Sequence, residues 1–146
     1  MINCLFSEDW ALVGTIDPAT YAAGAQLTDE IDMKNWEQLV AVLMIGTHSG
    51  AGIAFNFQSA SSSGGSYSAI SGKAITAVGG SPLQSNKQWI INLRNEEVTS
   101  NNEFVKAGVT LTGSPSAMVF SVAVFGKGRI KPSSDNDLSS VSEIIQ

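Results

Sequence analysis

The stretch EQLVAVLMIGTHSGAGIAFNFQS, residues 37–59, decides the fold. Its first half contains an unbroken apolar run, residues 39–45, which ends at Gly46. The run is too short to cross a bilayer and is rich in Val and Ile, which is typical of a strand buried on both faces.

The second half of this stretch alternates between apolar and other residues. Ile53, Phe55 and Phe57 fall on one side of an extended chain, and the residues between them fall on the other. This period of two is typical of a half-buried strand. The connecting segment GTHSGAG contains glycines that suit a reversal of the chain. We therefore predict a β-hairpin at the centre of an antiparallel core.

Similar short segments follow along the chain, separated by Gly, Pro, Ser and Asn. We expect strands within residues 21–27, 67–78, 89–93, 105–111 and 117–125, and a helical turn within 95–102. This spacing predicts an all-β fold, an antiparallel β-sandwich or a barrel, rather than βαβ units. The apolar runs 39–45 and 117–125 imply either that two sheets face each other or that a partner covers one outer face.

The sandwich is expected to occupy residues 21–132, between two irregular terminal arms. Residues 1–20 lack a clear period; they form either an irregular segment packed on their own domain or an arm that docks on a neighbouring subunit. Residues 133–146 are acidic and rich in Ser, which indicates either a disordered tail or an arm that becomes ordered on binding.

Composition excludes several classes of function. The 146 residues carry a net charge of −5 without a cationic cluster, so we expect no nucleic-acid binding. Cys4 is the only cysteine, which rules out an intrachain disulfide. No segment has the length of a membrane helix or the pattern of a secretory signal, so we expect synthesis in the cytoplasm and no membrane partner. Charged residues make up only 14% of the chain, against about 25% in an average protein, which favours covered surfaces.

No constellation of catalytic or metal-binding residues emerges from the sequence. His48 is the only histidine, so a metal site with two histidines cannot form within one chain, and we expect this residue to be solvated in its Gly-rich loop. Asp29, Glu30 and Asp32 lie close together, but they lack the spacing of a calcium-binding loop and are expected to form a solvated turn. We therefore expect neither an enzyme nor a cofactor.

The aromatic and terminal apolar residues are the candidates for an interaction site. Trp89 follows the alternation of its strand and is expected in the core, whereas Trp36 is expected at a rim or an interface. The tryptophans suit either sugar stacking or subunit contact. The residues predicted to form the interface are Leu5, Phe6, Trp10, Trp36, Ile144 and Ile145.

The order of these parts resembles the small capsid cement or head-decoration proteins of tailed bacteriophages. The resemblance covers residues 22–132. Its more telling features are the EIDM segment at residues 30–33, which leads into an apolar strand, and the SSGGSYSAI pattern within residues 61–70. It lacks a catalytic signature and leaves out both terminal arms.

The resemblance implies a jelly-roll-like sandwich in a homo-oligomer, a dimer or a trimer, on the exterior of a virion. Such a protein would bind the major capsid protein and cement neighbouring capsid subunits. The residues themselves leave an alternative open, a carbohydrate-binding β-sandwich with a receptor-binding or adhesive role.

Overall fold

The computed structural model describes residues 5–48, 51–77, 84–99, 103–113, 118–130 and 136–145. Its elements, in chain order, are α1 (Phe6–Asp9), β1 (Trp10–Tyr21), β2 (Gly24–Leu27), β3 (Ile31–Asp32), β4 (Trp36–Ile45), β5 (Ala51–Ala60), β6 (Ser68–Ala77), β7 (Gln88–Arg94), the 3₁₀ turn η2 (Asn95–Glu97), β8 (Phe104–Gly113) and β9 (Met118–Gly128). The turn η2 confirms the helical turn expected within residues 95–102.

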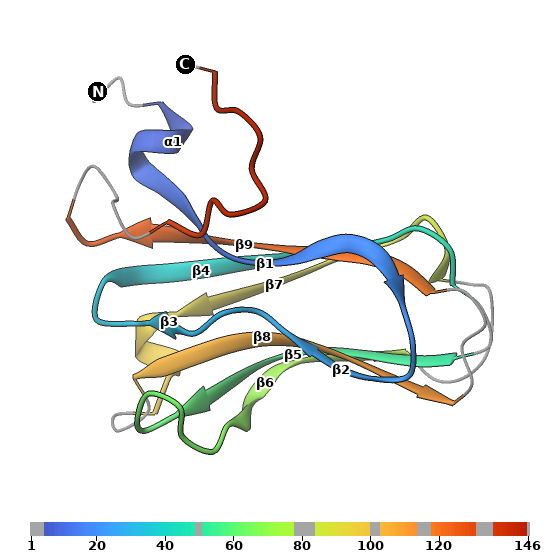
Figure 1. Ribbon diagram of the computed structural model, residues 1–146. Coiled ribbons are helices and arrows are strands. Elements are labelled where there is room, and N and C mark those ends of the chain that lie inside the picture. The colour runs from blue at the N-terminus through green and yellow to red at the C-terminus, as the bar shows by residue number, and fades with distance from the viewer. Residues whose placement is uncertain are drawn as a thin grey trace.

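The strands form two antiparallel sheets that face each other (Figure 1). The four-stranded sheet has the order β1-β9-β4-β7, and the five-stranded sheet has the order β2-β8-β5-β6 with β3 added beside β8. This arrangement, in which the chain passes repeatedly from one sheet to the other, is that of a jelly roll. The predicted all-β sandwich is confirmed.

The core lies between the two sheets and uses alternate residues of each strand. On β4 the buried residues include Leu39, Ala41 and Leu43, and on β5 they include Phe55 and Phe57. Because successive side chains leave opposite faces of a strand, each sheet presents one apolar row inward from every strand. The alternation read at residues 53–57 is therefore the inner face of β5.

The predicted hairpin between β4 and β5 is wrong. β4 pairs with β7 and β9 in the four-stranded sheet, whereas β5 pairs with β6 and β8 in the other sheet. Each strand already has two hydrogen-bonded neighbours, so the connection between them spans the sandwich instead of closing a ladder. A Gly-rich connection permits either course, and the sequence around Gly46 does not distinguish them.

The expected boundary at residue 20 also differs from the structure. Residues 10–20 belong to β1, which pairs with β9 over most of its length. The register shifts between Leu12 and Gly14 and again between Ile16 and Ala19. Each shift inserts residues into the strand and interrupts the period of two, which is why this strand reads as irregular in the sequence.

Trp36 lies in the core and not at a rim or an interface, so that prediction is wrong. Trp36 is 2% exposed and is the bulkiest of the fully buried residues described. Its ring packs on Gly126, where an added Cβ would come within 2.6 Å of the ring atom Cε3. Its carbonyl oxygen accepts hydrogen bonds from Asn95 Nδ2 at 3.2 Å and from Arg129 Nε at 3.3 Å. The packing of the Trp36 ring and the hydrogen bonds to its carbonyl oxygen therefore both hold the start of β4 in place.

The contact between Trp36 and Gly126 gives a prediction. Replacing Gly126 with Ala is expected to lower the free energy of unfolding by about 2 kcal/mol, because the new methyl group overlaps the indole ring. Urea denaturation measures the change. In a Trp36→Leu background the same replacement is expected to cost clearly less, since the overlap is gone. Equal costs in the two backgrounds would contradict the assigned contact.

Candidate interaction surface

The outer side of the four-stranded sheet carries an apolar surface. Val40 lies between Phe125 and Asn92 on the neighbouring strands, and Val42 lies between Ala123 and Ile90. We define the outer apolar face by these and the adjoining outward residues: Leu12 and Thr15 of β1, Ser121, Ala123 and Phe125 of β9, Val40, Val42 and Met44 of β4, and Gln88, Ile90 and Asn92 of β7.

Part of the outer apolar face is open to solvent. Met44 is 43% exposed and Ile90 is 58% exposed. Residues 39–45 are therefore buried on one face only, which corrects the expectation of a strand buried on both. Apolar residues nevertheless line the other face of β4 as well, with Val40 and Val42 partly buried.

The outer side of the five-stranded sheet differs in character. Its residues include Asn56, Gln58 and Lys106, with the Lys106 ammonium 4.7 Å from the centre of the Tyr67 ring. Among the large hydrophobic residues that are exposed in the described chain, only Leu27 belongs to this sheet. The apolar surface is thus confined to one side of the sandwich.

The two terminal segments lie on the four-stranded sheet, above β1 and β9 (Figure 1). Phe6 of α1 contacts Phe125, with ring centroids 5.6 Å apart, and stacks on Trp10 at 6.0 Å. The Asp137 amide donates to the Leu12 carbonyl oxygen at 2.8 Å, and Thr15 Oγ1 donates to the Asp137 carboxylate at 3.0 Å. We call residues 5–9 and 136–145 together the terminal ridge.

The terminal ridge and the strands beneath it line an open, largely apolar pocket of about 580 Å³. Its lining includes Phe6, Trp10, Leu138, Val141 and Ile144. The ridge thus brings Phe6, Trp10 and Ile144 together, three residues that the sequence analysis assigned to an interface. Leu5 and Ile145 belong to the same segments and are exposed.

Met44 and Ile90 are two exposed apolar residues of the outer apolar face that the sequence analysis missed. Ile90 interrupts the alternation of Trp89, Ile91 and Leu93, and this break was the available signal. In β7 the side chains of Ile91 and Leu93 are buried, whereas Trp89 is only partly buried and Ile90 points outward.

The free edge of β7 is protected against further pairing. Lys73 of β6 donates from Nζ to the Asn92 carbonyl oxygen at 2.8 Å and forms an ion pair with Glu97 at 2.7 Å. This contact lowers the pKa of Glu97, mainly through the hydrogen bond from Lys73. A lysine at an edge discourages the addition of another strand. The opposite edge strand, β1, carries two bulges, which have the same effect. Both edges of the four-stranded sheet are therefore protected against pairing with a further strand.

Glu30 fastens the Ser- and Gly-rich loop that follows β5. Its carboxylate accepts hydrogen bonds from the Gly64 amide at 2.9 Å and from the Tyr67 hydroxyl. The Gly64 amide, followed by the Ser63 and Tyr67 side chains, lowers the pKa of Glu30 to about 2. Burial, and then the bond to Glu30, raises the pKa of Tyr67. Glu30 therefore has structural partners, instead of belonging to a solvated turn.

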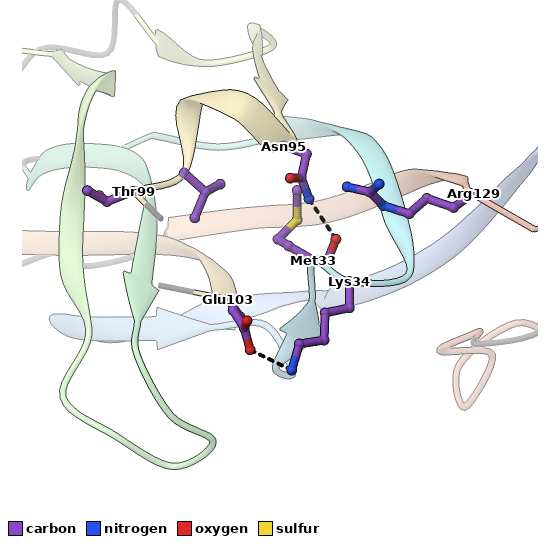
Figure 2. Close-up of a pocket in the computed structure, with 7 residues that line it drawn as sticks. Met33, Lys34, Asn95, Thr99, Glu103 and Arg129 are labelled. Atoms are coloured by element: carbon purple, nitrogen blue, oxygen red, sulfur yellow. Dashed lines mark hydrogen bonds and ion pairs between the residues drawn. The ribbon is translucent and has the colours of Figure 1, made fainter. Parts of the chain in front are cut away.

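A polar pocket of about 340 Å³ lies between η2 and the turn before β4 (Figure 2). Asn95 Nδ2 donates to the Met33 carbonyl oxygen at 2.7 Å, and Lys34 forms an ion pair with Glu103 at 2.6 Å. Arg129 points toward the pocket from the opposite side. The described lining residues include one carboxylate, Glu103, and no His, Cys or Ser. These contacts hold loops together, and they do not assemble a nucleophile beside a base.

His48 is buried, which contradicts its expected exposure. It is 4% exposed, and neither ring nitrogen has a hydrogen-bond partner in the described part of the chain. Its backbone amide donates a hydrogen bond to Ser85 Oγ at 2.9 Å. Within the described ranges, no three His, Cys, Asp or Glu side chains gather as a metal site. The helices described there are also too short to span a membrane.

The Glu30 contacts predict a loss of stability in acid. The pKa of Glu30 in the folded protein lies below its ordinary value of 4.5. The contribution of Glu30 to folding stability is therefore fully present above pH 4.5 and is lost as the pH falls toward 2. A Glu30→Gln variant is expected to show a weaker dependence of Tm on pH in this range. At neutral pH its Gly64 amide is expected to exchange roughly ten-fold faster. Glu103→Gln, which breaks an exposed ion pair, is the control and should leave Gly64 unchanged.

The unpaired nitrogens of His48 give a second prediction. His48→Leu has a similar volume and removes two buried polar atoms, so we expect unchanged stability or a gain of about 1 kcal/mol in urea denaturation. His48→Ala removes the same atoms but leaves a void, and is expected to cost about 2 kcal/mol. A large loss in the Leu variant would show that the imidazole has a polar partner.

Comparison with known proteins yields likeness of structure alone. No protein-family model matches the sequence, and no curated protein matches it significantly. A chain of the T13 particle of infectious bursal disease virus is 11% identical with a TM-score of 0.51; the match covers 87% of this chain and 33% of the viral one. Pseudomonas aeruginosa AlgX is 10% identical with a TM-score of 0.51, and the match covers 80% of this chain and 27% of AlgX.

A third similar structure is the SPBc2 prophage-derived protein YomS. It is 15% identical with a TM-score of 0.42, and the match covers 85% of this chain and 98% of YomS. This chain spans a third or less of the viral protein and of AlgX. At these identities the likeness shows the fold, an antiparallel β-sandwich with the strand order of a jelly roll.

Proposed function

We propose that this chain is a structural virion protein that binds the outer surface of a phage capsid and cements neighbouring major capsid subunits. The observation that carries the proposal is the outer apolar face, with Met44 and Ile90 open to solvent on one side of the sandwich. Proteins that remain single in solution rarely present such a surface, and larger ones mark sites of association.

The composition of the surface agrees with this role. Few charged residues are present in the whole chain, and Lys127 and Arg94, which lie on the same side of the four-stranded sheet, are next to one end of the outer apolar face. Charged groups are depleted at the centres of protein interfaces, where their desolvation is costly. The opposite sheet, with Asn56, Gln58 and Lys106 on its outer side, suits exposure to water.

The contacts of Glu30 give a structural basis for the resemblance to head-decoration proteins. The two segments that carry the resemblance, residues 30–33 and 61–70, meet where Glu30 binds Gly64 and Tyr67. The jelly-roll order of the strands, also found by likeness to a chain of an icosahedral virus particle, supports the same class of protein. No sugar-binding platform is proposed, because Trp36 is buried.

A cement protein needs no active site, because its effect on the shell follows from binding. A molecule that binds the assembled shell but not its free subunits stabilises the shell by mass action. Contacts repeated over a symmetric surface give high avidity even when each interface is modest. We therefore assign this chain no catalytic role and no cofactor.

The test compares particles with and without this protein. Particles that carry it are expected to release their genome at a higher temperature than particles from which it is deleted, measured by dye access on heating. Met44→Gln is expected to weaken attachment roughly ten-fold, because an apolar side chain of the face becomes polar. Leu27→Gln changes a residue of equal exposure on the other sheet and should attach normally. Equal heat stability, or absence of the protein from purified particles, would refute the proposal.

A further inference from the structure

We propose that the open pocket at the terminal ridge is a docking site for a protein segment in which large apolar side chains are flanked by Lys or Arg. The apolar side chains enter the pocket, and the flanking cations meet the carboxylates of the ridge. This inference rests on the proposed function and deepens it, because it states the chemistry of the capsid segment that the chain binds.

Three separate parts of the chain build this pocket, which we call the ridge pocket. Leu12 of β1 and Phe125 of β9 lie in the sheet beneath it, and residues of α1 and of the C-terminal segment line it from the ridge (Figure 1). The Phe6 and Trp10 rings, which also line it, stack with centroids 6.0 Å apart. Its volume of about 580 Å³ lies within the range of clefts that hold small ligands, so a bulky side chain fits inside.

The lining of the ridge pocket is open to water. Phe6 is 62% exposed, Ile144 is 51% exposed and Leu138 is 38% exposed, although all three line the pocket. The chain therefore gathers these side chains in one place without burying them. Contiguous apolar surface of this kind marks a site of interaction, because covering it removes the surface from water.

The negative charge of the chain is concentrated on the terminal ridge. The two segments of the ridge contain no Lys or Arg and four carboxylates, those of Glu8, Asp9, Asp137 and Glu143. They account for −4 of the net charge of −5. Lys127 of β9 lies opposite Trp10 in the sheet, but its ammonium group is paired with Glu37 at 3.5 Å.

The carboxylates of the ridge can take up cations without losing their present contacts. Glu8 accepts a hydrogen bond from the Leu5 amide at 2.8 Å, and Asp137 accepts bonds from side-chain hydroxyl groups. These neutral donors leave the negative charge uncompensated. Glu143 has neither a hydrogen bond nor an ion pair within the described ranges, and it directly precedes Ile144, which lines the ridge pocket.

The combination of an apolar pocket and an acidic ridge selects the class of partner. Burial of apolar side chains supplies most of the affinity. Charges around such a contact mainly set the rate of association and exclude partners of like charge. A basic and apolar segment satisfies both parts of the site, whereas a second copy would bring its own net charge of −5 to an acidic surface.

Binding of short peptides to the full chain tests the site. The probe is the peptide GKRLFLRKG with a fluorescent label, and polarisation measures its binding. The wild-type chain is expected to bind it at least roughly ten-fold more tightly than GEELFLEEG, in which the charge is reversed, or GKRSGSRKG, which lacks the apolar side chains. Added salt is expected to weaken the binding of the basic peptide, because the charges at the rim are exposed.

Two matched pairs of variants locate the binding site. Ile144→Gln makes the lining polar and is expected to weaken binding of the basic peptide roughly ten-fold. Ile145→Gln changes the next residue, which is outside the described lining, and should bind normally. Glu143→Lys reverses a charge of the ridge and is expected to weaken binding roughly ten-fold. Asp17→Lys makes the same change at an exposed position farther along β1 and should bind normally.

A separate measurement shows whether the ridge stays in place in these variants. The Asp137 amide donates to the Leu12 carbonyl oxygen at 2.8 Å and is expected to exchange with solvent at the wild-type rate in all four. A variant that binds weakly while this exchange is unchanged has lost a contact with the peptide. Faster exchange in Ile144→Gln and Glu143→Lys alone would show that they detach the ridge, and would overturn the assigned contacts.

The remaining outcomes separate this inference from the proposed function. The inference is overturned if the wild-type chain does not bind the basic peptide at about 1 mM, or if it binds all three peptides equally. It also fails if the chain associates with itself and Ile144→Gln abolishes that association, since a second copy then occupies the pocket. In each of these cases the proposed function survives if purified particles carry the chain. If the peptides bind as expected but particles lack the chain, the docking site survives and the proposed function fails.

Discussion

Burial of the two inner faces against each other is the constraint on which this molecule depends. A strand sends alternate side chains to opposite sides, so the demand for a core fixes the inward residues of every strand. The largest of these, Trp36, fits only because Gly126 lacks a side chain beside it. Once the inner faces are filled, the chemistry of the outer faces is free to differ between the sheets. One is polar, and the other keeps residues such as Met44 and Ile90.

The edges of the four-stranded sheet are protected against contact with another chain, whereas its outer face is not. Lys73 caps the free edge of β7 and bulges distort β1, so further strand pairing is discouraged at both ends of the four-stranded sheet. Its outer face has no such protection. The hydrogen bond from the Gly64 amide to Glu30 holds the loop at one end of the sandwich in place.

The sequence was sufficient for the fold class and for most strands, because alternation and glycine punctuation are local signals. The course of the chain between strands was not predictable in the same way. Whether the connection after Gly46 closes a hairpin or spans the sandwich depends on the partners of β4 and β5, which lie far along the chain.

Strand β1 was not predicted because its bulges remove the period of two that identifies a strand. His48 and Trp36 were misplaced, since burial in a loop or at a strand start has no periodic signature. Phe6, Trp10 and Ile144 were predicted as interface residues, but their packing beside one another was not predicted, and the exposed outward residues of β4 and β7 left only one signal, the irregular isoleucine Ile90.

The pairing of β1 with β9 has a consequence for how the protein is made. Trp10 is paired with Lys127. The first strand to be synthesised, β1, therefore cannot form its hydrogen bonds until β9, the last strand, has left the ribosome. Until then β4 also lacks one of its two neighbours, and apolar segments of the nascent chain stay exposed to chaperones and to aggregation. The four-stranded sheet therefore cannot be completed until β9 has been synthesised, and a chain truncated before β9 cannot form it.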